Sequence, residues 1–462
     1  QEMRLERDSM GELEVPANAY YGANSRRAEL NFPISKLRFG RSFVKAIAQI
    51  KQSAAVVNLE LGALDEEIAS AIIASAQRVI DGEFDEEFVV DIFQTGSGTS
   101  TNMNANEVIS NVAIEALGGE LGSRTPVHPN DHVNKGQSSN DVIPTSIHLA
   151  AAGAIQDNLL PALKELEDSL RAKSEEFWGV VKTGRTHLQD ATPIRLGQEF
   201  LGYTGQLELA GARARTALAE LSVLALGGTA VGTGIGMHPE FSSRVIVRLR
   251  ELTGLDLSET TNHFQAQSTL DAVVAASGQL KSIAVGLLKI ANDLRWLGSG
   301  PRAGIGEITL PEVQPGSSIM PGKVNPVIAE SVAMVSAQVI GNDTTIAIAG
   351  QSGNFELNVM MPVAAHNLLE SIDLLSTSAV NFAHQCVNGL EATGKGPEMV
   401  MQGLAIGTVL APIIGYDAAA GIAHEASVSG ENIREVALRM TDLTEEQLDE
   451  ILEPLSMTEP KA

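Results

Sequence analysis

Cysteine and aromatic residues are scarce in this sequence of 462 residues: it has one cysteine, and aromatic side chains make up 4% of it. The lone Cys386 allows no intrachain disulfide, no cysteine-based zinc site and no iron–sulfur cluster held by several thiolates. It is consistent with a reducing compartment, so we expect a cytoplasmic protein. With so few aromatic rings, Ala, Val, Ile and Leu must fill the interior.

Positive charge is also scarce, since 32 Lys and Arg residues stand against 57 Asp and Glu residues, a formal net charge of −25 at pH 7. A field of that sign disfavours phosphate backbones and anionic membranes, so we expect neither nucleic acid nor a membrane as a partner. A small anion can still bind, because local cations and helix N-termini act within a Debye length of about 8 Å. The long uncharged stretches 221–239 and 399–416 are interrupted by glycines and indicate buried soluble segments.

Hydrophobic residues recur at helical spacing from about residue 143 to residue 390. The pattern is sharpest in 270–297, where apolar residues seven positions apart form two columns: Val273, Leu280, Leu287 and Leu294, and Ala276, Ile283, Ile290 and Leu297. This repeat predicts a helix about 40 Å long in a left-handed bundle. Similar spacing predicts further helices over 147–177, with a kink at Pro161, and over 197–222, 327–347 and 363–386.

Helices this long and apolar cannot hide all of their surface within one chain, so we expect a homo-oligomer. Short helical patterns over 41–60 and 66–80 precede the long ones, and 388–398 indicates a linker. After the linker, Thr444 and Gln447 form a capping-box signature in a small helical tail. The sequence therefore predicts a mainly α protein with three domains: a mixed, mostly helical one at 1–135, a central long-helix bundle at 136–390 and a small helical one at 391–462.

Four polar, glycine-rich segments interrupt the predicted helices, at 95–107, 128–141, 182–193 and 315–326. Their Ser, Thr and Asn side chains, with a Lys and a His, suit multipoint hydrogen bonding of a small ligand that carries carboxylates. The same residue types also form ordinary turns and helix caps, so any single segment leaves both interpretations open. The presence of four such segments favours a binding site.

Two familiar motifs match only in part. Five residues instead of four separate Gly316 from Gly322, which disfavours a nucleotide-binding phosphate loop. His128 and His132 have the spacing of a helical metal pair, but Pro129 lies between them and no Glu follows His128, which disfavours a metal site.

At the four polar segments the sequence resembles the fumarase/aspartase superfamily, and specifically the class II fumarases. The segment 316–326, GSSIMPGKVNP, is similar to the superfamily signature. The resemblance extends over essentially the whole chain, because five further motifs occur in the family's order: GSGTS, HPND, SSND, GRTHLQDA and GGTAVGTG. His187 is decisive within the superfamily, because aspartases typically have Gln there, and PAK where this chain has Pro321, Gly322 and Lys323. The resemblance implies a mainly α, three-domain fold whose long-helix bundle forms the core of a homotetramer.

The activity that the resemblance implies is the reversible anti hydration of fumarate to L-malate, a step of the tricarboxylic acid cycle, without a metal or an organic cofactor. Removing a proton beside a carboxylate builds an aci-carboxylate with two negative charges at one end. Most of the barrier reduction must therefore come from donors aimed at that charge. The resemblance also implies that three subunits contribute to each active site.

The resemblance assigns roles to individual residues. It implies that Ser317 is the base that acts on carbon, that His187 with Glu330 handles the water on the opposite side, and that Lys323 and Asn325 stabilise the aci-carboxylate. We hypothesise that Lys323 and backbone N–H groups of the loop stabilise the Ser317 alkoxide. The further substrate-binding positions are Ser97, Gly98, Thr99, Ser138, Ser139, Asn140, Thr186, Ser318 and Val324.

A second anion site near the entrance is implied at His128, Pro129, Asn130 and Asp131. Some family members carry a basic residue just upstream, where this chain has Arg124 and Thr125, and whether either one contributes is left open.

An ammonia lyase such as aspartase, a non-catalytic helical scaffold and a hydrolase with a Ser/Lys pair are the alternatives. His187 and Gly322 disfavour the aspartase. The five implied catalytic residues together disfavour the scaffold, because buried polar groups cost stability. The hydrolase lacks its usual nucleophile motifs.

Overall fold

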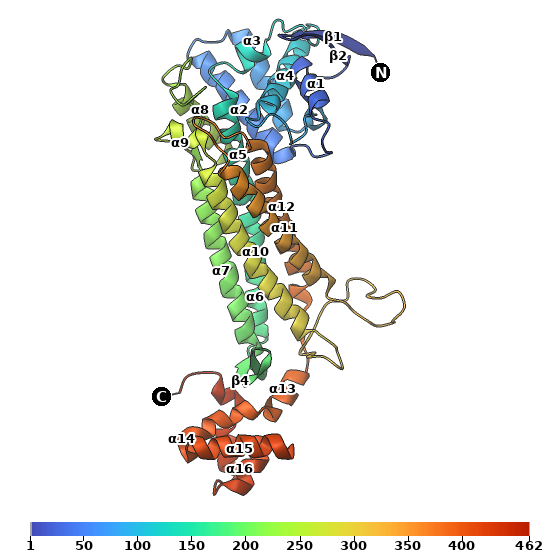
Figure 1. Ribbon diagram of the computed structural model, residues 1–462, viewed down its shortest axis with the longest axis vertical. Helices are drawn as coiled ribbons and strands as arrows, with labels where there is room; N and C mark the ends of the chain where they lie inside the picture. The colour runs from blue at the N-terminus through green and yellow to red at the C-terminus, as the bar shows by residue number, and fades with distance from the viewer. Residues whose placement is uncertain (1, 462) are drawn as a thin grey trace. The chain divides into compact units, whose positions relative to one another are not determined.

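The computed structural model describes residues 2–461 and shows a chain made mainly of α-helices (Figure 1). The chain divides into two compact units. One contains Gln1–Pro161, Ala212–Ala284 and Val335–Ser376, and the other Ala162–Gly211, Val285–Met334 and Thr377–Ala462. The prediction of a mainly α protein is confirmed, and the three-domain division stays a prediction.

The long helices lie close to their predicted positions: α6 (Leu160–Glu176), α7 (Leu196–Leu221), α10 (Asp271–Leu297), α11 (Val327–Gly350) and α12 (Met361–Gln385). In α10, all eight residues of the two predicted apolar columns are at most 5% exposed. The sevenfold hydrophobic spacing thus predicted the buried face of this helix correctly.

The predicted helix over 147–177 is interrupted. A π-helical turn, Ile155–Leu159, separates α5 (Ser139–Ala154) from α6. Pro161 has no N–H to donate to the carbonyl of Asp157, and its ring crowds that carbonyl, which accounts for the irregular turn just before it.

The first unit contains most of the shorter helices: α1 (Ala23–Asn31), α2 (Arg41–Glu60), α3 (Glu66–Ile80), α4 (Thr99–Ala116), α8 (Phe241–Thr253) and α9 (His263–Ser268). The helices predicted over 41–60 and 66–80 are thus confirmed as α2 and α3. Its strands are few: β1 (Met3–Asp8) with β2 (Gly11–Pro16), antiparallel, and β5 (Val223–Leu224) with β6 (Ser258–Glu259), parallel. α2 packs against α3, α4 and α5 and forms much of the core of this unit (Figure 1).

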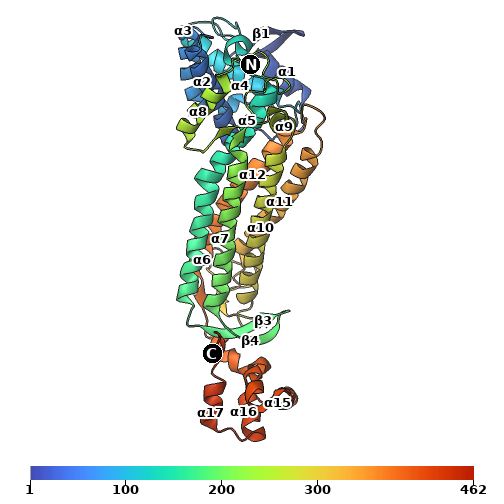
Figure 2. The ribbon, with the colours of Figure 1, turned by 90° about the vertical axis from the view of Figure 1, so that its left-hand side faces the viewer.

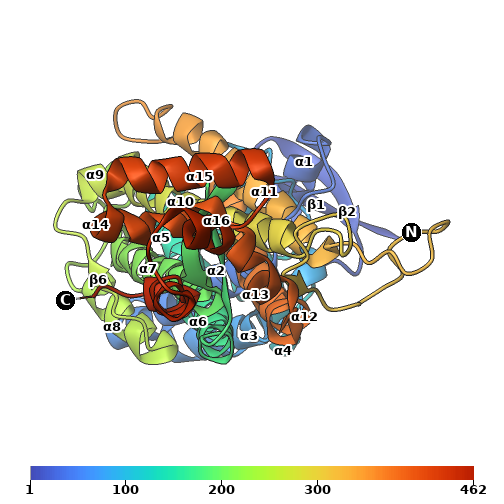
Figure 3. The ribbon, with the colours of Figure 1, turned by 90° about the horizontal axis from the view of Figure 1, so that it is seen from below.

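In the second unit, an antiparallel hairpin of β3 (Val181–Thr186) and β4 (Gln189–Arg195) connects α6 to α7 (Figure 2). The C-terminal part contains α13 (Lys395–Met399), α14 (Ala411–Ile414), α15 (Tyr416–Ser429), α16 (Ile433–Met440) and α17 (Glu445–Ile451). These last four helices share a core of their own that includes Ile422, Val436 and Leu448. Within it, α15 packs against α14 and α16 (Figure 3). The predicted capping box of Thr444 and Gln447 is confirmed at the start of α17.

The prediction of a linker over 388–398 is wrong. β8 (Glu391–Ala392) pairs with β7 (Ile308–Thr309), Leu390 is buried, and α13 begins at Lys395. The glycines of this segment indicated a linker, but its strand depends on a partner far away in the sequence.

By length and composition alone, two helices of residues 2–461, α10 and α11, could cross a membrane, and the bent pair Lys395–Gln402 and Leu404–Ile414 could form a third span. Only 44% of the apolar window of α10 and 33% of that of α11 is buried inside the chain. Apolar side chains that stay exposed include Val285 of α10 and Met334 of α11.

Candidate active site

Three predicted binding residues of the first unit form a continuous chain of hydroxyl groups. The Oγ1 atom of Thr99 lies 2.7 Å from the Oγ atom of Ser97 and 2.7 Å from the Oγ atom of Ser139. Thr99 is the first residue of α4, and Ser139 is the first residue of α5. Because helix N-termini carry partial positive charge and free N–H groups, two such ends joined by hydroxyls make a site that suits a carboxylate.

Glycine is required on either side of Ser97. Gly98, the N-cap of α4, has φ +72°, and a Cβ atom there would lie 2.9 Å from the side chain of Ile143. A Cβ atom at Gly96 would lie 1.8 Å from the carbonyl oxygen of Val359. The GSGTS pattern thus reflects a backbone that passes too close to its neighbours for any side chain.

The start of α5 is fixed by a capping box. The Ser138 Oγ atom accepts a hydrogen bond from the Asn140 N–H at 3.2 Å, and the Oδ1 atom of Asp141 accepts one from the Ser138 N–H at 3.0 Å. The other carboxylate oxygen of Asp141 accepts bonds from the N–H groups of Gly227 and Thr229, both at 3.0 Å. Burial raises the pKa of Asp141, and these hydrogen bonds oppose that shift. Asp141 therefore ties the GGTAVGTG segment to the hydroxyl chain.

Sequence reasoning did not single out Asp141, although the S-x-x-D spacing of a capping box would have revealed it. Its neighbour Asn140 strengthens the same connection, because the Nδ2 atom of Asn140 donates to the carbonyl oxygen of Ala230 at 2.8 Å.

The HPND segment forms a π-helical turn, Pro129–Val133, capped by its own histidines. The Nδ1 atom of His128 accepts hydrogen bonds from the N–H groups of Asn130 and Asp131, at 3.0 and 3.1 Å, and the Nδ1 atom of His132 accepts one from the His128 N–H at 2.8 Å. Burial lowers the pKa of His132, which favours its neutral form. Within residues 2–461, no group of three or more His, Cys, Asp and Glu side chains is arranged to hold a metal ion.

His187 lies at the tip of the β3–β4 hairpin. Thr186 pairs with Gln189, so His187 and Leu188 form a two-residue turn, and both have φ +58°. Such turns normally use Asn and Gly, because a left-handed conformation costs other residues roughly 1–2 kcal/mol each. Both side chains are exposed. A strained backbone at an exposed histidine indicates that its position is used for function.

Buried ion pairs anchor this hairpin. Lys182 on β3, with a side chain 2% exposed, pairs with Glu199 and, at 3.0 Å, with Glu307. Arg185, one residue before Thr186, pairs with Glu307 at 2.7 Å. Desolvation raises the pKa of Glu199, and the charge of Lys182 opposes that rise. Sequence reasoning missed Lys182, Glu199 and Glu307, because a lysine in a polar segment gives no sign of burial.

The signature loop 315–326 is held by its own backbone. The Ser317 Oγ atom accepts hydrogen bonds from the N–H groups of Met320 at 3.1 Å and of Ile319 at 3.3 Å. The side-chain amide of Asn325 donates to the carbonyl oxygen of Gly316, and a Cβ atom at Gly316 would lie 1.8 Å from the carbonyl oxygen of Lys323. The loop borders a hollow of about 360 Å³ lined by residues that include Ser317 and Lys323.

Comparisons with known proteins decide the family. A lyase family model matches residues 11–341, and a model of the fumarase C C-terminus matches residues 406–459. The chain is 51% identical over 462 residues to a class II fumarate hydratase of Methylorubrum extorquens, covering 100% of this chain and 98% of the relative. The chain belongs to the class II fumarase family. The resemblance inferred from the motifs is thereby confirmed.

Two further relatives agree. A mitochondrial fumarate hydratase of Rhizopus oryzae is 50% identical over 464 residues, with 100% of this chain and 94% of that protein covered. The crystal structure of the class II fumarase of Schistosoma mansoni superposes with a TM-score of 0.96 at 41% identity and covers 99% of both chains. The predicted fumarase-like fold is confirmed.

Within this class II fumarase chain, the remaining implied residues make few contacts with one another. Glu330 lies in the first turn of α11, and Ser318, Lys323 and Val324 are exposed. Among residues 2–461, no hydrogen bond or ion pair joins His187 to Glu330 or to the 315–326 loop. The predicted pairing of His187 with Glu330 and the predicted second anion site stay predictions.

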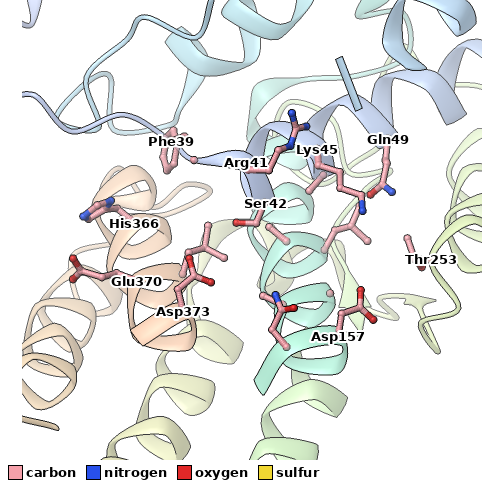
Figure 4. A pocket seen from close by; sticks show the side chains of 18 of the residues that line it. Phe39, Arg41, Ser42, Lys45, Gln49, Asp157, Thr253, His366, Glu370 and Asp373 are labelled. Atoms are coloured by element: carbon pink, nitrogen blue, oxygen red, sulfur yellow. The ribbon is translucent and has the colours of Figure 1, made fainter. Parts of the chain in front are cut away.

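A separate hollow of about 700 Å³ in the first unit shares no residue with the predicted site. Figure 4 shows Arg41 and Lys45 of α2 on one side of it, and Glu370 and Asp373 of α12 on another. Its charges are of mixed sign, whereas the hydroxyl chain contains no carboxylate and lies at two helix N-termini. We therefore place the candidate active site of this fumarase at the hydroxyl chain.

Proposed function

We propose that this chain catalyses the reversible anti hydration of fumarate to L-malate in the tricarboxylic acid cycle. The observation that carries the proposal is the row of hydrogen-bonded hydroxyls of Ser97, Thr99 and Ser139 across two helix N-termini. The relatives that match this protein over nearly their whole length are named fumarate hydratases. That arrangement suits one carboxylate of a small dicarboxylate. Gly98, Ser138 and Asn140 shape the same subsite.

Stabilisation of the aci-carboxylate falls to Lys323 and Asn325. The ammonium of Lys323 is exposed at the loop and free to turn toward an incoming anion. The amide of Asn325 is already oriented by its bond to Gly316. An oriented donor such as the Asn325 amide is effective because it needs little reorganisation, whereas Lys323 becomes oriented only when it turns toward the substrate.

Ser317 removes the proton from carbon. A serine hydroxyl is a weak base, so its alkoxide needs stabilisation. The N–H groups of Ile319 and Met320 already donate to the Ser317 Oγ atom, which supports this role. On the opposite face of the double bond, His187 with Glu330 takes up and releases the proton of the water that adds to carbon.

The assembly is a homotetramer whose sites combine residues of three subunits. This would explain why His187 and Glu330 share no bond within one chain, and why α10 and α11 leave much apolar surface uncovered. Lys281 of α10 and Asp343 of α11 form an ion pair at 2.9 Å. A charged pair within these helices is costly in lipid, which favours other copies of the chain as the cover.

A reducing compartment such as the cytoplasm is part of the proposal. Its support is the single cysteine, Cys386, which is buried and has no partner for an intrachain disulfide.

Ultraviolet absorbance tests the activity directly, because fumarate has a conjugated double bond that L-malate lacks. Purified protein is incubated with fumarate, with L-malate, and with aspartate in turn. We expect loss of absorbance from fumarate in water alone and gain of absorbance from L-malate. Release of fumarate from aspartate would indicate an ammonia lyase, and no change with any of the three would indicate a scaffold.

A further inference from the structure

Lys51 is a fully buried lysine in the middle of α2. It is 0% exposed, and its Nζ atom donates to the Oδ1 atom of Asn134 and to the Oε1 atom of Gln137, both at 2.9 Å. Among residues 2–461 it forms no ion pair, so only neutral amides surround the ammonium directly. Burial lowers the pKa of Lys51 to about 7, and the charge of Asp141 opposes that shift. A buried ammonium without a carboxylate partner is costly and calls for a physical reason.

The two amides that Lys51 holds form the loop in front of α5. The Nδ2 atom of Asn134 donates to the carbonyl oxygen of Gln137 at 3.3 Å, and the Nε2 atom of Gln137 donates to the carbonyl oxygen of Val133 at 3.1 Å. Gln137 directly precedes Ser138, the N-cap of α5. The position of Ser138 and Ser139 therefore depends on this loop.

The same network reaches α4. The Nδ2 atom of Asn102, in the first turn of α4 that Thr99 begins, donates to the Oδ1 atom of Asn134 at 3.2 Å. Lys51 and Asn102 thus share one acceptor, and through it the starts of α4 and α5 are held together. These are the two helix ends that the hydroxyl chain joins.

Asp141 does not neutralise Lys51 by direct pairing. Its two carboxylate oxygens accept the N–H groups of Ser138, Gly227 and Thr229. Whenever Lys51 is protonated, the region around the hydroxyl chain therefore holds a buried positive charge that no carboxylate contacts.

We propose that Lys51 is a positioning residue for the dicarboxylate: through Asn134 and Gln137 it fixes the hydroxyls of Thr99, Ser138 and Ser139, and its charge is balanced when the substrate binds. This inference rests on the proposed function. In the free protein the nearest carboxylate, Asp141, acts on Lys51 only from a distance. A bound dianion adds negative charge beside this network, so Lys51 acts on binding more than on the chemical step.

Lys51→Met tests the proposal, because it keeps most of the side-chain volume and removes the charge and the donors. We expect the KM for fumarate and the dissociation constant of succinate, an unreactive dicarboxylate measured by calorimetry, to rise about tenfold or more, while kcat changes less. Lys51→Arg should recover most of the binding, because it keeps a charged donor. Lys45→Met, an exposed change on the same helix, is the matched control and should leave both constants unchanged.

A purely structural lysine would give another result: a lower melting temperature with an unaltered KM and an unaltered succinate constant in the protein that stays folded, which would overturn the proposal. If Lys51→Met fails to fold, Gln137→Leu tests the proposal instead, because it removes one of the two oxygens that accept from Lys51 and leaves α2 intact. We expect it to raise both constants, and unchanged constants would count against Lys51. Failure of the proposed function can be distinguished from failure of this inference. In the first case the wild-type protein leaves fumarate unchanged, whatever the Lys51 substitutions do to succinate binding.

Discussion

Thr99 and Ser139 share a hydrogen bond of 2.7 Å between their hydroxyl oxygens, although they lie 40 residues apart in the sequence. The bond joins the first residues of α4 and α5, so one pair of side chains aligns two helix N-termini on the same point. The second hydrogen bond of Thr99, to Ser97, extends the row of hydroxyls to the glycine-rich turn before α4. Thr99 is the centre of the row.

Thr99→Ala should therefore weaken the site more than the loss of one peripheral hydroxyl would. Removing the Thr99 hydroxyl leaves Ser97 and Ser139 without their shared hydrogen-bond partner and takes a donor away from the substrate. We expect kcat/KM for fumarate to fall by about 10²-fold, in the range of removing one positioned donor. Ser243→Ala, which removes an exposed hydroxyl on α8 that bonds to a backbone carbonyl, should keep normal kinetics. Near-normal kcat/KM in Thr99→Ala would contradict the assignment of the site.

Gly98→Ala should reduce stability for two separable reasons. The left-handed φ costs an alanine roughly 1 kcal/mol, and the new Cβ atom would lie 2.9 Å from Ile143. Gly118→Ala isolates the first cost, because Gly118 has φ +80° and nothing lies within 4 Å of the position that a methyl group would take there. We expect Gly98→Ala to lower the free energy of unfolding by about 1–3 kcal/mol more than Gly118→Ala does, as overpacking commonly costs. If urea unfolding shows the same loss of unfolding free energy for both variants, the Ile143 side chain moves aside at no cost and the prediction is wrong.

His187→Asn should separate activity from stability. Asn tolerates the left-handed backbone better than His, so we expect the melting temperature to stay the same or rise. Loss of the acid–base group should lower the turnover of fumarate by about 10²–10⁴-fold. His424→Asn, a change on α15 in the C-terminal part, is the control and should alter neither property. A histidine with only a structural role would show the reverse, with lower stability and retained turnover.

Glu107 should make stability depend on pH. It is buried in α4, where it accepts hydrogen bonds from Ser25 and Asn24, and burial raises its pKa from 4.5 to about 7. The folded state therefore holds a proton between about pH 4.5 and 7 that the unfolded state has released. The stability that this group contributes is present at low pH and is lost as the pH rises through about 7.

Glu107→Gln removes that titration. Relative to wild type, we expect its melting temperature to improve as the pH increases from about 5 to 8, because the variant has no charge to bury. Glu120→Gln, an exposed change in the loop after α4, should run parallel to wild type over the same range. A difference between Glu107→Gln and wild type that stays constant with pH would show that Glu107 does not titrate there.

The sequence was most informative where the structure depends on local periodicity. The apolar columns of α10 and the capping box of Thr444 are settled within a few turns of helix, and both are found as predicted. The polar motifs also identified the family and the residues that make up the hydroxyl chain. Recognition of this kind works because GSGTS and the signature loop depend on glycines that close backbone approaches require.

Elements without a local turn signal, or with a distant partner, could not be predicted. The β3–β4 hairpin turns at His187 and Leu188, which carry no Asn-Gly or Asp-Gly signal. β8 forms only because β7 lies beside it. Lys51 would be expected to face solvent, and it is buried because the amide oxygens of Asn134 and Gln137, more than 80 residues later, accept its hydrogen bonds.

The partly covered surfaces of α10 and α11 bear on how the protein is made. Only 44% and 33% of their apolar windows are buried inside the chain. If the proposed homotetramer covers the rest, a newly synthesised copy exposes these apolar surfaces until it assembles. Yield in a cell should then depend on how fast copies encounter one another, and a slow encounter leaves the chain to chaperones or to aggregation.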